Sequence, residues 1–154
     1  MSDETEHTQA RKAWMSLLAK APPARLEALV ETLDDAAAWP EFTWLRAPKT
    51  GGVMVRGKSG GTGAAFNLGE MTVTRCALRL ESGEVGHAYV QGRDKGHATR
   101  AARIDAMMQT ERKGVLRAQV LEPLEAEMQA AKASRAAKAA ATKVEFFTMV
   151  RGED

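Results

Sequence analysis

The stretch EMTVTRCALRL, Glu70 to Leu80, predicts the best-defined β-strand of the chain, because its side chains alternate between two faces. Those faces would carry Met71, Val73, Arg75, Ala77 and Arg79 on one side, and Thr72, Thr74, Cys76, Leu78 and Leu80 on the other. The Ser82-Gly83 pair and the run EVGHAYVQG follow directly, and they predict a β-hairpin. Consecutive strands with short links pair antiparallel, so we expect a mostly antiparallel sheet.

Upstream of this hairpin, the sequence predicts helices first and then short strands. Apolar residues recur at helical spacing over residues 8–20 and again from Pro23, and Pro22 breaks the pattern, so we expect an N-terminal helical hairpin. FTWLRA (42–47) and GGVMVRG (51–57) are two short strand candidates. The chain should form a single domain over residues 1–154, with residues 1–10 as a flexible N-terminal segment.

Downstream of the hairpin, the sequence predicts C-terminal helices. A first helix would run on through residues 105–112, and a break near Gly114 would precede a long, alanine-rich run over residues 115–142, which Pro123 can kink or restart. The apolar end, KVEFFTMVRGED, is expected to dock as a terminal strand on the sheet, or as a hook on a partner. The predicted fold class is therefore α+β.

The composition is that of an ordinary globular protein, with 44% hydrophobic and 27% charged residues. No apolar run is long enough to span a membrane, and the polar N-terminus does not resemble a secretory signal. The single cysteine, Cys76, cannot form an internal disulfide, which favours the cytoplasm. Aromatic residues are scarce and are not interleaved with basic ones, so we expect no nucleic-acid partner.

Charge is distributed unevenly along the chain. Residues 1–45 have four basic and eight acidic side chains, residues 46–103 have ten basic and four acidic, and residues 104–154 have eight of each. The middle segment could face anions. Alternatively, some of its arginines could pair with acids of the first segment.

The stretch GRDKGHATRAARIDAMM, Gly92 to Met108, begins as a turn and continues as a helix. Asp94 is placed to cap the helix N-terminus. Arg93, Lys95 and His97 oppose the helix dipole there, which would be offset by a bound anion or an acidic partner. His97 also shares a helical face with apolar residues, which favours a structural role for that side chain.

A second candidate anion site is GKSGGTG, residues 57–63, where Gly60, Gly61, Thr62 and Gly63 could direct backbone N–H groups at an oxyanion. Its residue order is not that of a Walker A loop, and a flexible connection between strands is the alternative. The three histidines share no ligand spacing, so no metal is expected. Cys76 would be a buried thiol in mid-strand, and no catalytic residue is identified.

Several stretches, taken in order, resemble the PhnG family of small subunits of the carbon–phosphorus lyase core complex. They are WMSLLA (14–19), GGTG (60–63), MTVTRCALRL (71–80), GRDKGHATRAARIDAMMQ (92–109) and FFTMVRG (146–152). The resemblance implies phosphonate metabolism in a hetero-oligomer with PhnI as the most direct partner, alongside PhnH, PhnJ and PhnL. It carries no catalytic residue to this chain.

The activity that the resemblance implies belongs to the complex. With PhnH, PhnI and PhnL, the family supports transfer of an alkylphosphonate onto the ribose anomeric carbon of ATP, which displaces adenine. ATP is then the substrate of the complex, and no cofactor is expected on this chain alone. The isolated chain would be an inactive, non-autonomous transferase subunit. The alternative is a purely structural scaffold for PhnI without substrate contact.

Overall fold

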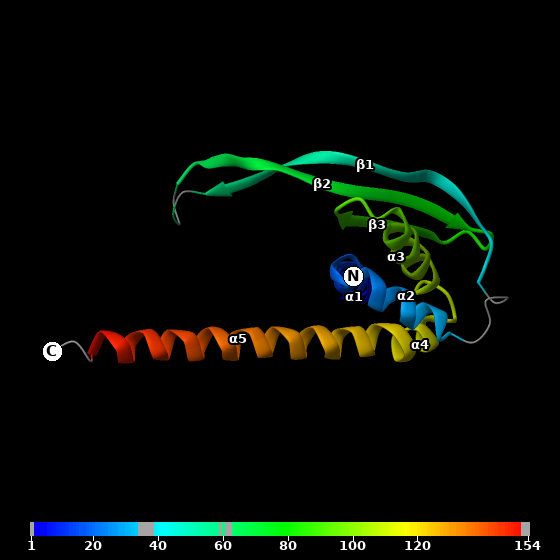
Figure 1. The fold of residues 1–154 in the computed structure, drawn as a ribbon. Helices are drawn as coiled ribbons and strands as arrows, with labels where there is room; N and C mark the ends of the chain where they lie inside the picture. Colours follow the sequence, from blue (N-terminus) through cyan, green and yellow to red (C-terminus); the bar gives the residue numbers. More distant parts are fainter. Residues whose placement is uncertain (1, 34–38, 59, 61–62, 152–154) are drawn as a thin grey trace.

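The computed structural model describes residues 2–33, 39–58, 60 and 63–151, with side chains described as far as Lys143. Its elements are α1 (Ser2–Lys20), α2 (Pro23–Glu31), β1 (Phe42–Lys58), β2 (Ala65–Leu80), β3 (Val85–Gln91), α3 (Lys95–Met107), α4 (Lys113–Leu116), the π-helix η2 (Arg117–Leu121) and α5 (Glu122–Arg151). One sheet covers a layer of helices (Figure 1), so the expected α+β class is confirmed.

The sheet has the order β1-β2-β3 and is antiparallel throughout, as predicted. The β2–β3 hairpin turns at residues 81–84, where Gly83 has a φ of 107° that favours glycine. Cys76 pairs with Ala88, and Leu78 pairs with Gly86. Cys76 and Leu78 lie on the face of β2 that is buried against the helices.

The two short strands predicted at 42–47 and 51–57 are wrong as separate elements, because β1 runs unbroken from Phe42 to Lys58. Register shifts occur on both sides of Arg46, and Pro48 falls in the second one, between Arg46 and Lys49. Proline has no backbone N–H to donate to a neighbouring strand. It is tolerated in an edge strand at such a register shift, because the pairing is already interrupted there. Strand β2 also begins earlier than predicted, at Ala65 instead of Glu70.

The N-terminal helical hairpin is confirmed, with one change of boundary. Helix α2 begins at Pro23 as expected, but α1 begins at Ser2 instead of residue 8. Residues 2–10, which we expected to be flexible, therefore form the first half of α1. Asp3 and Glu4 lie in its first turn, where acidic side chains interact favourably with the helix dipole.

The C-terminal helices follow the prediction in part. Helix α3 ends at Met107, and the next helix starts at Lys113 and continues through η2 into α5. Pro123 is the second residue of α5, directly after the π-helix. Proline lacks an N–H and crowds the carbonyl one turn earlier, so a wider turn at that point lets the helix continue.

The predicted terminal strand is wrong, because α5 continues as a helix to Arg151. The sequence contains no glycine or proline between Pro123 and Gly152, and its alanine-rich part has high helix propensity. Nothing in the sequence therefore stops the helix earlier. From residue 129 to residue 143 every side chain of α5 is exposed, so this part of the helix leaves the body of the protein.

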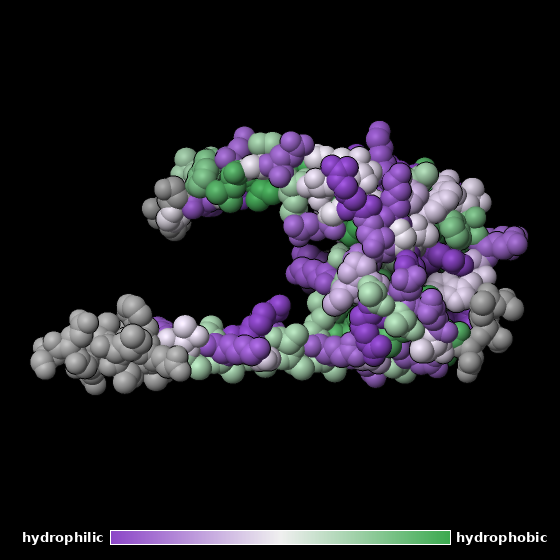
Figure 2. Space-filling view, viewed as in Figure 1, coloured by the Kyte–Doolittle hydropathy of each residue, from purple (hydrophilic) through white to green (hydrophobic). Residues whose placement is uncertain are grey.

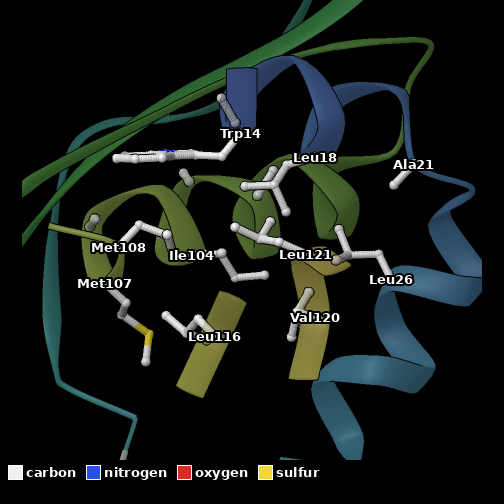
Figure 3. Close-up of a cluster of buried hydrophobic side chains, with 14 of the residues drawn as sticks. Trp14, Leu18, Ala21, Leu26, Ile104, Met107, Met108, Leu116, Val120 and Leu121 are labelled. Carbon is white, nitrogen blue, oxygen red and sulfur yellow. The ribbon is translucent and has the colours of Figure 1, made fainter. Parts of the chain in front are cut away.

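The core lies between the sheet and the helices, with α3 at its centre (Figure 3). The buried side chains include Trp14, Leu18, Leu26, Ile104, Met107, Met108, Leu116, Val120 and Leu121. Small residues let α3 approach the sheet closely. A Cβ added at Gly86 would lie 1.9 Å from the carbonyl oxygen of Ala102, so only glycine fits this strand position.

Two segments project from this core, and we call them the hairpin arm (residues 51–58 and 65–72) and the helix arm (residues 129–143 of α5). Strand β3 ends at Gln91, paired with Val73, so the hairpin arm has only two strands. Both arms extend in the same direction, and open space separates them (Figure 2). The molecule is thus a compact body with two exposed projections.

Candidate functional site

The predicted anion site at the start of α3 is built on a tight turn out of β3. Gly92 has a φ of 96°, its N–H donates to the carbonyl oxygen of Thr72 at 2.8 Å, and its own carbonyl accepts from the Thr74 hydroxyl at 2.7 Å. The predicted cap at Asp94 is confirmed, because its Oδ1 accepts from the backbone N–H of His97 at 2.9 Å. This local hydrogen bonding fixes where the neighbouring cations lie.

The structure separates the three predicted side chains of this site. Arg93 and Lys95 are exposed, and neither side chain makes a hydrogen bond or ion pair with any residue that the structure describes. His97 is 3% exposed, and its Nε2 lies 2.8 Å from the carbonyl oxygen of Leu18. Arg93 and Lys95 therefore remain available to an anion or acidic group, whereas His97 ties α3 to α1.

A further cation, Arg100, lies over the first turn of α3 and was not among the predicted residues. A Cβ added at Gly96 would lie 2.9 Å from its guanidinium, and that guanidinium pairs with Glu27 of α2 at 3.2 Å. One arginine of the basic middle segment thus pairs with an acid of the first segment, which is the alternative reading of the charge pattern. Arg100 follows Gly96 by four residues, one helical turn, and this spacing is the sequence signal that could have indicated that Arg100 lies over Gly96.

The glycine-rich candidate lies in another part of the molecule. Gly60 and Gly63 are at the tip of the β1–β2 hairpin, and Gly61 and Thr62 lie outside the described residues. Gly60 has a φ of 73°, in the left-handed region that favours glycine. Figure 1 shows this tip far from α3, so the two predicted anion sites do not combine into one.

A concavity of about 500 Å³ lies beside His97, between the end of α1 and the strands. Helix α1 contributes Ala19 and Lys20 to its lining, Ala21 follows that helix, and α2 contributes Pro23. The strands contribute Met71, Val73, Tyr89 and Gln91. Lys20 and Tyr89 are exposed, so they offer the concavity an ammonium and a phenol group. Sequence reasoning missed both residues, because only the fold brings the end of α1 beside the strands.

Among the residues that the structure describes, Asp105 is the polar group with the most hydrogen bonds, and it is fully buried. Arg11 donates to both of its oxygens, at 3.2 and 2.9 Å, and the Trp14 indole N–H donates to Oδ1 at 2.8 Å. The backbone N–H of His87 donates to Oδ2 at 2.9 Å. These bonds come from two elements, so Asp105 anchors α1 and β3 to α3 and both of its carboxylate oxygens are occupied within the fold.

The Cys76 thiol is buried, as predicted, and donates to the carbonyl oxygen of Ala98 at 3.3 Å. Burial raises the pKa of this thiol to about 11, because the thiolate would lose its solvation. The group is therefore protonated at neutral pH and is a poor nucleophile.

Arg103 occupies a second partly buried position, on the side of α3 nearest β1. Its guanidinium carbon lies 4.6 Å from the ring centre of Trp39 and 5.1 Å from that of Phe42, and burial lowers its pKa. Its Nε is buried without a hydrogen-bond partner among the described atoms. The contacts with two rings indicate that Arg103 stabilises the packing of β1 on α3.

Across the described part of the chain, no three His, Cys, Asp or Glu side chains come together in a way that could hold a metal ion. No described helix is both long enough and apolar enough to cross a membrane. Among the described residues, the buried side chains of Thr74, His97 and Asp105 are used in hydrogen bonds that hold the fold together, and the unpaired cations Arg93 and Lys95 are on the surface.

Comparison with known proteins gives two matches that agree. A family model described as "Phosphonate metabolism protein PhnG" matches residues 9–152. A protein of Rhizobium meliloti (strain 1021), named alpha-D-ribose 1-methylphosphonate 5-triphosphate synthase subunit PhnG, is 44% identical over 153 residues, which cover 99% of this chain and 96% of that protein. The match spans the helices, the sheet and the α3 turn, and the chain therefore belongs to the PhnG family of phosphonate metabolism proteins.

Proposed function

We propose that this chain is a subunit of the synthase that makes α-D-ribose 1-alkylphosphonate 5-triphosphate, within the carbon–phosphorus lyase core complex. The observation that carries the proposal is the 44% identity to the Rhizobium meliloti synthase subunit over nearly the full length of both chains. The cytoplasm is the compartment in which ATP would be available as the substrate of this complex.

In the proposed reaction, an oxygen of the alkylphosphonate bonds to the anomeric carbon of ATP. The bond from that carbon to adenine breaks, and adenine leaves with the bonding electrons and takes up a proton. Both reactants are anionic, so fixed cations near them lower the repulsion in the transition state. Arg93 and Lys95 are the side chains of this chain that we propose for that role or for an acidic partner surface, because both are exposed and unpaired.

The chain would act as a non-autonomous subunit, inactive alone, with PhnI as its direct partner and PhnH, PhnJ and PhnL in the same complex. The internal use of Asp105, His97 and Cys76 supports this reading, because these groups are bonded within the fold. The second candidate function is a scaffold for PhnI that makes no substrate contact. The two exposed arms favour it, because a long helix without burial is stabilised mainly by what it lies on.

One co-expression experiment separates these functions. The chain would be produced with and without PhnI, PhnH and PhnJ, and the mass of the purified species measured by light scattering. A complex of fixed stoichiometry is expected, whereas a soluble chain that stays apart from these subunits would refute the proposal.

The double variant Arg93→Gln/Lys95→Gln then tests the substrate role, with Arg79→Gln/Lys113→Gln as a control of equal charge change at other exposed positions. ATP-dependent release of adenine by the complex, with added PhnL, would be measured. Normal assembly with slower adenine release assigns the two cations to substrate. Lost assembly assigns them to the partner, and no change in either measurement would remove them from the functional site.

A further inference from the structure

The hairpin arm has one apolar face. Antiparallel partners share a face, and the register pairs Val53 with Met71 and Gly57 with Phe66. Val55 lies between Val53 and Gly57 on the same face of β1. The β2 strand has one extra residue, Leu68, at the register shift. The Leu68 side chain lies over Gly57, because a Cβ added at Gly57 would be 2.8 Å from it.

These pairings define the hairpin apolar face: Val53, Val55, Phe66, Leu68 and Met71. Phe66 is 45% exposed and Leu68 is 62% exposed. The opposite face of the arm is more polar, since Arg56 pairs there with Asn67 and Met54 with Glu70. Figure 2 shows hydrophobic atoms on the projecting end of the hairpin, bordering the open space between the arms. Apolar side chains of this size on one unpaired face indicate an interaction surface.

The hairpin apolar face leads into two concavities that continue toward the helix arm. Met71 of this face and Lys20 both line the concavity of about 500 Å³ beside His97. Lys20 also lines a second concavity, of about 350 Å³, together with Met128, Ala131, Lys132 and Arg135 of α5. We call this continuous surface, from the hairpin apolar face through Lys20 to Arg135, the trough.

Charge on the helix-arm side of the trough is mostly positive. Residues 128–143 of α5 contain four basic residues and no acidic one, whereas the hairpin arm carries two basic residues and one acidic residue on its opposite face. The cations Lys20, Lys132 and Arg135 line the second concavity and outnumber Glu125, the acidic residue that lines it with them. An occupant with carboxylates would be complementary to that arrangement.

We propose that the trough binds a segment of a partner subunit that presents apolar side chains to the hairpin apolar face and carboxylates to Lys20, Lys132 and Arg135. This inference rests on the proposed function, because it identifies the surface through which the chain would join its complex. A bound polypeptide fits better than a nucleotide, because a nucleotide held by the three cations would leave Phe66 and Leu68, near the tip of the arm, exposed.

Variants at exposed positions test this surface without disturbing the core. Leu68→Glu places a charge on the hairpin apolar face, and Met54→Glu is its matched control, since Met54 is 56% exposed on the opposite face of the same arm. Lys132→Glu/Arg135→Glu reverses charge in the trough, and Lys12→Glu/Arg79→Glu makes the same change of charge at exposed positions outside it. Circular dichroism would verify that all four variants are folded.

Each variant would be co-expressed with PhnI, PhnH and PhnJ, and its affinity for the other subunits measured by titration with light scattering. Leu68→Glu and Lys132→Glu/Arg135→Glu should each weaken assembly by at least about tenfold, while both controls stay within about twofold of the original chain. In the original complex, hydrogen exchange at residues 53–55 and 66–71 should be slower than in the free chain.

The results separate the two proposals. If the original chain assembles and both trough variants assemble equally well, the trough inference is refuted and the proposed function stands. If the original chain joins no complex, the proposed function fails. If the free chain is a dimer that Leu68→Glu converts to a monomer, the occupant is a second copy, and the proposed acidic partner segment is refuted.

Discussion

Replacing Asp105 by asparagine should destabilise the fold more than any exposed charge substitution, because this carboxylate is fully buried and accepts four hydrogen bonds. The amide would present an N–H group to donors on Arg11, Trp14 or the His87 backbone. Breaking a buried charged pair costs about 3–5 kcal/mol. The Arg11 side chain is 29% exposed and can regain water, so we expect the lower end of that range, a loss of about 3 kcal/mol in the free energy of unfolding.

The measurement is urea unfolding of the purified chain, followed by circular dichroism, for the original and the Asp105→Asn variant. In a thermal unfolding scan of the same two proteins, a loss of about 3 kcal/mol should lower the melting temperature by about 6–12 °C in a domain of this size. Glu127→Gln is the control, because both side chains of its ion pair with Arg25 are 45% exposed and water screens their attraction, so this substitution should change the stability far less than Asp105→Asn. A loss below about 1 kcal/mol for Asp105→Asn would refute the anchor role.

Three further predictions follow from the packing. Gly86→Ala should destabilise the fold by about 1–3 kcal/mol or more, since the new methyl group would meet the Ala102 carbonyl, whereas Gly51→Ala, with open space around it, should cost far less. Urea unfolding of both variants measures this, and equal losses would contradict it. The Cys76 thiol should react with an alkylating reagent at pH 8 only when the chain is unfolded, which mass spectrometry would detect; fast reaction of the folded chain would contradict its burial. Its pKa is raised on folding, so its contribution to stability should be complete below pH 9 and decline as the pH rises toward 11.

The features that the sequence predicted correctly are those encoded by neighbouring residues. Asp94 caps α3 through a residue three positions away, Pro23 starts α2, and Ser82-Gly83 turns the β2–β3 hairpin. Strand lengths were wrong where Pro48 seemed to break a strand, because pairing with β2 outweighs the local preference. The helical end of α5 was missed because apolar residues near a terminus suggested docking on the sheet.

The rest of the site depends on contacts between residues far apart in the sequence. Asp105 meets Arg11 from 94 positions away, and His97 meets Leu18 from 79 positions away. The sequence gives no direct signal for such a pair beyond a charged side chain on a largely apolar helix. It did place Arg93 and Lys95 beside the α3 cap, but the orientation that separates His97 from them follows from the packing of α1 on α3.

The π-helix η2 controls where the helix arm points its cations. A residue of an α-helix advances the side-chain direction by about 100° around the axis, so one residue more or less within η2 would rotate every side chain of α5 by that angle. Lys132 and Arg135 would then turn away from Lys20 while the helix stayed equally long. Inserting or deleting one residue at positions 117–121 would therefore rotate the side chains of the helix arm about its axis. Such a change would turn the cations to another side without altering the composition of the arm.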